Sequence, residues 1–305
     1  MAKSIRLLTD DIRKNRAIYL MVLPVVLYFF IFKYLPMYGA VIAFKDFSPA
    51  RGIWGSEWVG LDHFTAFFKS YYFVRVLKNT FLISFYSLIF GFPAPILLAL
   101  LLNELRQKWF KSIVQTVSYL PHFVSIVVIA GLIIDFTNRD GIVNSVITFF
   151  GGESSTLLND PSNFRTIFVS TGVWQELGWS SIIYLAALSG INPELYEAAR
   201  VDGAGRIRQI WSVTLPGIVP TIMILLILRV GGLMEVGFEK IVLLYNPNTY
   251  ETADVISSFV YREGLAQGND YSYTTAVGLF QSVLNFVLLI GANSFSRRLT
   301  GNQLW

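Results

Sequence analysis

Arg229 and Glu176 are charged residues that interrupt otherwise apolar stretches of the sequence. An arginine facing lipid at the middle of a membrane would be costly, so Arg229 is expected to face protein or a water-filled cavity. It could form an internal ion pair, for which Glu176 is a candidate partner. Alternatively, its guanidinium could line a cavity and contact sugar hydroxyls, or pair with a sugar carboxylate through two parallel hydrogen bonds. The residue types leave both roles open.

Aromatic and amide side chains in the same apolar stretches are of the types that bind sugars. Such sites combine aromatic surfaces with a few well-placed polar groups. The candidates are Trp174, Trp179, Tyr184, Gln281 and Asn285. Gln281 and Asn285 are one helical turn apart and form the best pair. Membrane helices commonly use these residue types for packing or for anchoring at the bilayer boundary, so a structural role is the other interpretation.

The sequence shows no arrangement of side chains that is typical of an enzyme. There is no cysteine, and the two histidines, His63 and His122, lie far apart, each without a second ligand at metal spacing. Each is expected to be a hydrogen-bonding group rather than a ligand. Glu251 and Asp254 could in principle form a carboxylate pair of the glycosidase kind, but in a polar loop we expect them to be solvated surface. We therefore predict no catalytic residues and no metal site.

Long apolar stretches dominate the chain, and only 14% of its 305 residues are charged, compared with about 25% in a soluble domain. A membrane-spanning helix needs roughly 20 mostly apolar residues. The sequence thus predicts an all-α integral membrane protein whose residues 1–305 form one transmembrane domain. Six spans are expected, at about 15–35, 78–103, 112–135, 165–190, 215–235 and 274–296.

Lysine and arginine are concentrated on one side of these spans, as is typical of cytoplasmic segments. They are Lys3, Arg6, Arg13, Lys14, Arg16, Arg106, Lys108, Lys111, Arg200, Arg206, Arg208, Arg297 and Arg298. Both termini and the connection from 192 to 216 are therefore expected in the cytoplasm. The net charge of +4 reflects this bias, and no basic patch interleaved with aromatics indicates nucleic-acid binding.

The connection from 192 to 216 is polar and rich in small residues. Asn192 suits a helix N-cap and Pro193 the first helical position. Gly203 can end that helix in a left-handed conformation. Small residues allow another backbone to approach closely, so the segment could dock a second protein; it could also be an amphipathic connection that lies on lipid. On the other side of the membrane, an amphipathic stretch from about Thr252 to Tyr261 is expected to form a short helix on, or dipping into, the outer surface.

The motif in the connection resembles the EAA signature of ABC importer permeases. Its elements are Glu197-Ala198-Ala199, Asp202-Gly203-Ala204 and Leu215-Pro216, with one mild departure at Val213, where isoleucine is commoner. In that family the segment is the coupling helix, which sits in a cleft of the ATP-binding subunit. Flanking sequences such as "GVWQELGWSSIIYLAALSGINPELYEAA" and "LLYNP" are similar to the carbohydrate-uptake branch. "YLPMYGAVIAFKDFSP", "VGLDHF" and "YLPHFVS" resemble the lipoprotein-linked polysaccharide permeases of Bacillus and the alginate permeases of sphingomonads.

The resemblance implies the membrane fold of type I importers, in the plasma (inner) membrane of a bacterium. It implies four kinds of partner besides membrane lipid: a homologous second permease, two ATP-binding subunits, an extracytoplasmic solute-binding protein and a saccharide. The chain has no Gly-x-x-x-x-Gly-Lys-Ser/Thr phosphate loop, so ATP and magnesium are expected in the partner subunits and no cofactor in this chain. The resemblance and Arg229 together favour an acidic glycan such as alginate.

Two other classes of function were weighed against an importer permease. An ion-coupled secondary transporter or channel acting alone would favour acidic residues at mid-membrane in paired broken helices, for which Glu176 is thin support. A membrane-embedded enzyme or scaffold would favour a catalytic cluster, which the sequence lacks. A carrier acting alone has no need of a cytoplasmic docking segment, so that segment favours the importer permease.

Overall fold

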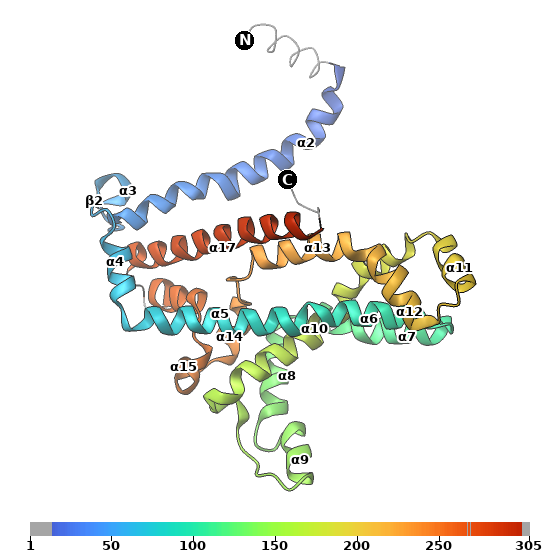
Figure 1. Cartoon of the computed structure of the whole chain (residues 1–305). Helices are drawn as coiled ribbons and strands as arrows, with labels where there is room; N and C mark the ends of the chain where they lie inside the picture. The colour runs from blue at the N-terminus through green and yellow to red at the C-terminus, as the bar shows by residue number, and fades with distance from the viewer. Residues whose placement is uncertain (1–13, 267, 269, 301–305) are drawn as a thin grey trace.

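The computed structural model describes residues 14–266, 268 and 270–300 (Figure 1). Lys3, Arg6, Arg13 and residues 301–305, on which the predicted cytoplasmic termini partly depend, lie outside the described residues. Figure 1 shows the long helices α5 (Tyr71–Gly91), α13 (Leu215–Gly231) and α17 (Tyr271–Thr300) running in roughly one direction. Short helices gather at the two ends of this bundle.

In the described part of the chain, four helices are long and apolar enough to cross a membrane by themselves: Arg16–Phe44, Tyr71–Glu104, Arg206–Gly231 and Tyr271–Arg298. They correspond to the predicted first, second, fifth and sixth spans. The first comprises α2 (Arg16–Phe29), a π-helical turn (Phe30–Tyr34) and a 3₁₀ stretch (Leu35–Phe44). The second joins α5 to α6 (Pro93–Glu104) at Phe92.

The third predicted span is not one straight helix. It consists of α7 (Lys108–Tyr119), a 3₁₀ turn (Leu120–Phe123) and α8 (Ile126–Thr137), followed by α9 (Ile142–Phe149). The two halves are bent by 102°. Pro121 lies in the turn, and the Ser125 side chain caps α8 by accepting a hydrogen bond from the Val128 N–H. In Figure 1, α8 and α9 project to one side of the bundle.

The fourth predicted span falls within α10 (Pro161–Ser189), a helix of 29 residues. Asp160 caps its start by accepting a hydrogen bond of 2.8 Å from the Ser162 N–H, and this bond lowers the pKa of Asp160 below its ordinary value. The helix packs against α5, α6, α7 and α13. At Gly178, a Cβ atom would collide with the Ser118 carbonyl oxygen, so the glycine lets α10 and α7 touch. α10 carries many polar side chains and is not among the described helices that are apolar enough to cross a membrane by themselves. The total of six spans therefore remains a prediction.

The remaining elements are short and fill the two ends of the bundle. At one end lie α11 (Pro193–Val201), α12 (Arg206–Gln209) and a π-helical turn (Ile210–Thr214). The other elements are an antiparallel pair of two-residue strands, three 3₁₀ or π-helical turns and five short helices. They are β1 (Lys45–Asp46), α3 (Gly52–Gly55), β2 (Glu57–Trp58), α4 (Asp62–Lys69), Leu157–Asn159, α14 (Phe238–Leu244), Pro247–Thr249, α15 (Tyr250–Ala253), α16 (Ile256–Val260) and Tyr261–Ala266.

The amphipathic stretch from Thr252 to Tyr261 is helical in part but does not lie on the surface. Its apolar residues Ile256 and Phe259 are 0% and 1% exposed and belong to one core cluster with Phe67, Val76 and Val277. The apolar side therefore packs onto α4, α5 and α17 rather than onto lipid. The helical periodicity in the sequence correctly predicted a short helix, but its apolar side is buried against other helices of the same chain.

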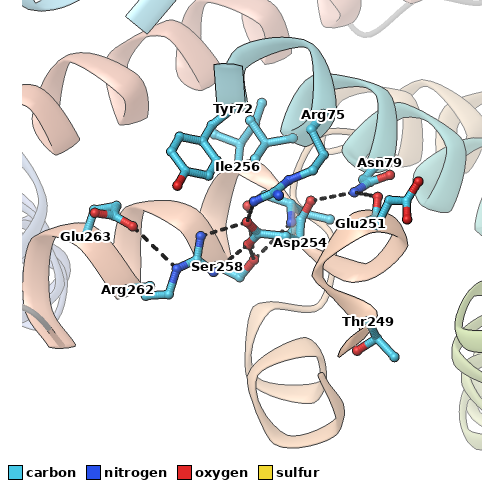
Figure 2. Close-up of polar contacts among 12 residues, drawn as sticks. Tyr72, Arg75, Asn79, Thr249, Glu251, Asp254, Ile256, Ser258, Arg262 and Glu263 are labelled. Carbon is cyan, nitrogen blue, oxygen red and sulfur yellow. Dashed lines mark hydrogen bonds and ion pairs between the residues drawn. The ribbon is translucent and has the colours of Figure 1, made fainter. Parts of the chain in front are cut away.

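Asp254 is not solvated surface, as the sequence suggested, but fully buried. Figure 2 shows Arg75 and Arg262 both directed at its carboxylate, with Nη2–Oδ2 distances of 3.1 Å and 2.7 Å. Burial opposes the charge of Arg262, but the hydrogen bond and negative charge of Asp254 hold its pKa above the usual value. Asn79 donates to the carbonyls of Glu251 and Asp254 at 2.9 Å and 3.0 Å. These contacts fix the loop before α16 to α5.

Candidate translocation cavity and coupling segment

A cavity of about 880 Å³ lies among α5, α6, α10, α13 and α14. The predicted residues Arg229, Glu176, Trp179 and Tyr184 line it. Trp174, Gln281 and Asn285 are not among the lining residues, and Trp174 is 48% exposed. The structure therefore brings four of the seven candidate substrate-path residues to one cavity.

Arg229 and Glu176 do not pair with each other. Both Glu176 carboxylate oxygens lie 3.1 Å from Nδ1 of His122, which also lines the cavity. Arg229 is exposed and has no ion pair within the residues that the structure describes. The candidate ion pair between Arg229 and Glu176 is therefore not formed, and Glu176 instead contacts His122 from the turn between α7 and α8.

His122 also stacks on Trp179, with ring centroids 4.6 Å apart and planes at 4°. Glu176 and Trp179 are three residues apart on α10, so they present neighbouring groups on one helix face. One face of the Trp179 ring is therefore occupied by His122. The stack and the His122–Glu176 contact together hold the bend between α7 and α8 against α10.

The backbone between α13 and α14 is not helical and is held by α17. The Met234 N–H donates to Oδ1 of Asn285 at 3.0 Å, and Nε2 of Gln281 donates to the Met234 carbonyl at 2.7 Å. Nδ2 of Asn285 also donates to Oε1 of Glu235 at 3.3 Å. Irregular backbone at membrane depth needs such partners. Gln281 and Asn285 thus position the segment that brings Glu235 to the cavity wall.

Lys240 on α14 is a cavity residue that sequence reasoning missed. It is 5% exposed and donates to the Phe168 carbonyl at 3.2 Å and to Oγ1 of Thr171 at 2.8 Å. Its neighbours Ile241 and Leu244 are buried. A lysine in such an apolar helical turn is the sequence signal that could have identified it. Two of its three N–H groups are used by α10, which leaves one for another acceptor.

The charged residues that line the cavity are of both signs. Arg229 and Lys240 face the same space as Glu176, Glu235 and Glu239. Carboxylates accept hydrogen bonds from hydroxyl groups, and the two cations can receive carboxylates or hydroxyl oxygens. The cavity is therefore equipped to bind a large, polyhydroxylated molecule, with two positions for negative charge.

Local sequence fixes the shape of the segment from 192 to 216. Oδ1 of Asn192 accepts a hydrogen bond from the Glu194 N–H at 3.1 Å, and Pro193 begins α11. Gly203 has φ +76°. Its N–H donates to the Arg200 carbonyl at 3.0 Å, and the Ala204 N–H donates to the Ala199 carbonyl at 2.9 Å. These two bonds form a Schellman motif, so the left-handed helix end predicted at Gly203 is confirmed.

The same segment presents side chains that none of the described residues covers. Val201, Ile207 and Trp211 are 88%, 75% and 69% exposed. Among the motif residues, Glu197, Ala198, Asp202, Gly203 and Pro216 are exposed and Ala199, Ala204 and Leu215 are half-buried. Figure 1 shows α11 and α12 at the end of the bundle opposite α4. The segment therefore forms a projection with an apolar and small-residue surface.

Comparison with known proteins agrees with this architecture. Residues 91–301 match the family model described as "Binding-protein-dependent transport system inner membrane component". The chain is 46% identical to Protein LplB of Bacillus subtilis, over 94% of this chain and 90% of that protein. It is 47% identical to the polygalacturonan/rhamnogalacturonan transport system permease protein YteP of the same organism, over 93% and 89%.

A solved structure gives the same picture. The chain superposes with a TM-score of 0.88 on one chain of the crystal structure of a bacterial ABC transporter involved in the import of the acidic polysaccharide alginate. The two are 49% identical over 96% of this chain and 99% of that one. The chain therefore belongs to the family of binding-protein-dependent transport system inner membrane components.

Proposed function

We propose that this chain is the permease subunit of an ATP-driven importer for oligo- or polysaccharides, most specifically for an acidic glycan such as alginate. It forms the translocation path together with a homologous second permease in the bacterial plasma membrane. Two ATP-binding subunits engage segment 192–216 from the cytoplasm and hold the ATP and magnesium. An extracytoplasmic solute-binding protein delivers the saccharide. The chain itself is not an enzyme, and nucleic acid is no partner.

The observation that carries this proposal is the projecting segment with its capped helix α11. Exposed Val201, Ile207 and Trp211 in a polar connection are costly unless they bind a partner. The Schellman turn at Gly203 holds them in one arrangement. A rigid projection of this kind transmits force, whereas a flexible loop would absorb it.

Two observations support an acidic glycan. The alginate transporter chain and YteP are both close to half identical to this chain, and their names refer to polymers that contain uronic acids. In addition, Arg229 and Lys240 line the cavity. Glu176, Glu235 and Glu239 lie in the same cavity, so a bound carboxylate must sit close to the two cations to be attracted overall.

An ion-coupled carrier acting without an ATPase is not favoured. It would leave the exposed surface of segment 192–216 without a partner, and the relatives are permeases of ABC systems. Reconstitution distinguishes the two functions directly. A carrier would move sugar along an ion gradient with this chain alone, whereas an importer permease would need the other subunits.

The test is reconstitution of the chain with its second permease, ATPases and binding protein in proteoliposomes. ATP turnover and uptake are then measured against matched oligomers of uronic acids and of neutral sugars. We expect uronic oligomers to stimulate both. Stimulation by neutral oligomers alone would overturn the acidic substrate but not the importer. ATP turnover that never responds to binding protein and glycan would overturn the importer itself.

A further inference from the structure

A second cavity, of about 370 Å³, lies between the first turns of α5 and α10 and the helix α15. It shares no lining residue with the translocation cavity. Arg75, Lys78 and Arg165 line it, together with the single carboxylate of Glu251. Three cations and one anion around a small space make it a site for a negatively charged group.

The charges in this cavity are only partly satisfied by the protein. Arg75 donates to Asp254, but its Nε is buried and has no hydrogen-bond partner. Arg165 donates through Nη2 to Oδ1 of Asn79 at 2.7 Å and through Nε to the Thr252 carbonyl at 3.3 Å. Lys78 is exposed and makes no polar contact with any described residue. Asp254 already neutralises part of Arg75 and Arg262, so Lys78 and Arg165 have only Glu251 against them.

The position of the cavity along α5 corresponds to the headgroup level of a bilayer. The helix Tyr71–Glu104 has 34 residues and is therefore about 51 Å long, whereas the hydrocarbon core is about 30 Å thick. Roughly 10 Å at each end then lies among the headgroups. Arg75 and Lys78 are about 6 Å and 10 Å from the start of α5 at Tyr71. Arg165 is about 6 Å from the start of α10.

An apolar stripe on α5 continues from the cavity towards the middle of the membrane. Val74, Lys78, Phe81 and Phe85 follow one another at spacings of four, three and four residues, so they share a helix face. Val74, Phe81 and Phe85 are 67%, 47% and 39% exposed. The rings of Phe81 and Phe85 stack with centroids 5.9 Å apart. A charged pocket at headgroup depth thus adjoins an exposed apolar surface that is suited to contact a lipid acyl chain.

We propose that this cavity binds the phosphate of an anionic phospholipid, with an acyl chain lying along Val74, Phe81 and Phe85. Guanidinium and ammonium groups are the usual partners of phosphate oxygens. Basic pockets between membrane helices bind lipid headgroups on the cytoplasmic side, and the same contacts serve a headgroup at the predicted outer end of the bundle, where this cavity lies. The depth of Lys78 favours a lipid over a soluble acidic protein, which would have to reach below the bilayer surface.

The test uses the assembled importer complex, purified in detergent and stripped of lipid. Native mass spectrometry then counts bound lipid after addition of phosphatidylglycerol, of phosphatidylcholine or of inorganic phosphate. We expect phosphatidylglycerol to be retained more than phosphatidylcholine. Lys78→Gln should reduce the retained fraction at least threefold, whereas Lys78→Arg should keep it. Lys78 has no polar partner in the described chain, so its removal leaves no buried group unpaired and the complex should assemble.

Lys69→Gln is the matched control, because Lys69 on α4 is an exposed lysine outside the cavity. It should retain lipid as the wild type does. Equal retention by Lys78→Gln and the wild type would overturn the proposal. So would binding of inorganic phosphate without phosphatidylglycerol, which would assign the site to a free anion. Loss of a partner subunit from the Lys78→Gln complex, with lipid retention unchanged, would assign the face to a protein interface.

Discussion

At the residue scale, the two cations of the translocation cavity differ in how many of their N–H donors are already bound by other residues. Lys240 is buried and donates to two oxygens of α10. Arg229 is exposed and forms no ion pair with a described residue. Its whole guanidinium is therefore available to a ligand. Lys240 instead couples the position of α14 to α10 and offers one remaining N–H.

Replacement of Arg229 by alanine should impair transport of acidic glycans more than that of neutral ones. A hydrogen bond to a charged group contributes about 1.5–3 kcal/mol, so the loss for uronic oligomers should be on the order of tenfold or more. Uptake by proteoliposomes, with both kinds of oligomer, measures the difference. Arg229→Lys should restore part of the acidic uptake. Equal loss for both substrates would instead assign Arg229 a structural role.

Replacement of Asp254 by asparagine should destabilise the protein, because it leaves Arg75 and Arg262 near each other without their shared counter-charge. Removal of one partner from a buried ion pair costs about 3–5 kcal/mol. The side chain of Asp254 is 0% exposed, and those of Arg75 and Arg262 are 20% and 12% exposed. Thermal unfolding of the purified complex should therefore begin at a clearly lower temperature.

Asp46→Asn is the matched control for that substitution. Asp46 also pairs with an arginine, Arg51, but at 3.4 Å and with both side chains at least half exposed. Exposed pairs of this kind contribute about 0–1 kcal/mol, so the unfolding temperature should hardly change. Similar destabilisation by both substitutions would show that the buried network contributes no more to stability than an exposed ion pair does.

At the element scale, a single glycine determines how segment 192–216 turns back to the membrane. Gly203 has φ +76°, where a β-branched residue is strained, and a Cβ there would meet no atom within 4 Å. The need for glycine at position 203 therefore comes from the backbone conformation and not from crowding by the described residues. Gly205, two residues on, is equally uncrowded but has an ordinary φ of −68°.

Gly203→Val should detach the ATPases and abolish uptake without unfolding the membrane helices. A left-handed conformation costs about 1–2 kcal/mol for a residue with a side chain, so the turn should rearrange and move α11 out of place. Co-purification of the ATPases and binding-protein-stimulated ATP turnover measure the effect. Gly205→Val is the control and should keep both. If the Gly203→Val complex stays intact and active, the coupling role of this turn is wrong.

Elements whose determinants are local were predictable from the sequence, and those with distant determinants were not. Asn192, Pro193 and Gly203 lie at the two ends of one short helix, α11, and the structure confirms both ends. The 102° bend after α7 was missed, because apolar length predicts a span but not its direction. Asp254 was misplaced because Arg75, one of its two partners, is 179 residues away.

The residues around the translocation cavity likewise divide into those that local sequence predicts and those that depend on distant parts of the chain. Arg229, Glu176 and Tyr184 were found because polar groups in apolar stretches indicate a shared interior space. The pairing of Glu176 with His122 depends on the bend between α7 and α8, which no local pattern encodes. Gln281 and Asn285 were singled out as a pair for sugar contact, but they do not line the cavity. Their hydrogen bonds to Met234 arise from the unwound backbone after α13, which hydropathy alone does not reveal.

At the scale of the whole molecule, α11 and α12 of the projecting segment lie at one end of the bundle, and α15 lies towards the other (Figure 1). The buried Asp254 follows α15 directly. The translocation cavity lies among helices that contact both regions. α10 contacts α15 near the network, while α13 continues from the π-helical turn that follows α12. A displacement of segment 192–216 would therefore act directly on α13 and on the non-helical residues that line the cavity.

The orientation of the molecule can be tested with single cysteines, because the sequence contains none. Val201 lies on the projecting segment and Glu153 in the loop after α9, and both are exposed. If the positively charged side is cytoplasmic, Val201→Cys should react with a membrane-impermeant maleimide only in inside-out vesicles, and Glu153→Cys only in right-side-out ones. Co-expression of the ATPases should protect Val201→Cys, because a docked subunit covers it, and should leave Glu153→Cys reactive. Labelling of Val201→Cys from the outside would invert the orientation and remove the coupling mechanism. Reactivity that the ATPases never change would show that the subunits dock elsewhere.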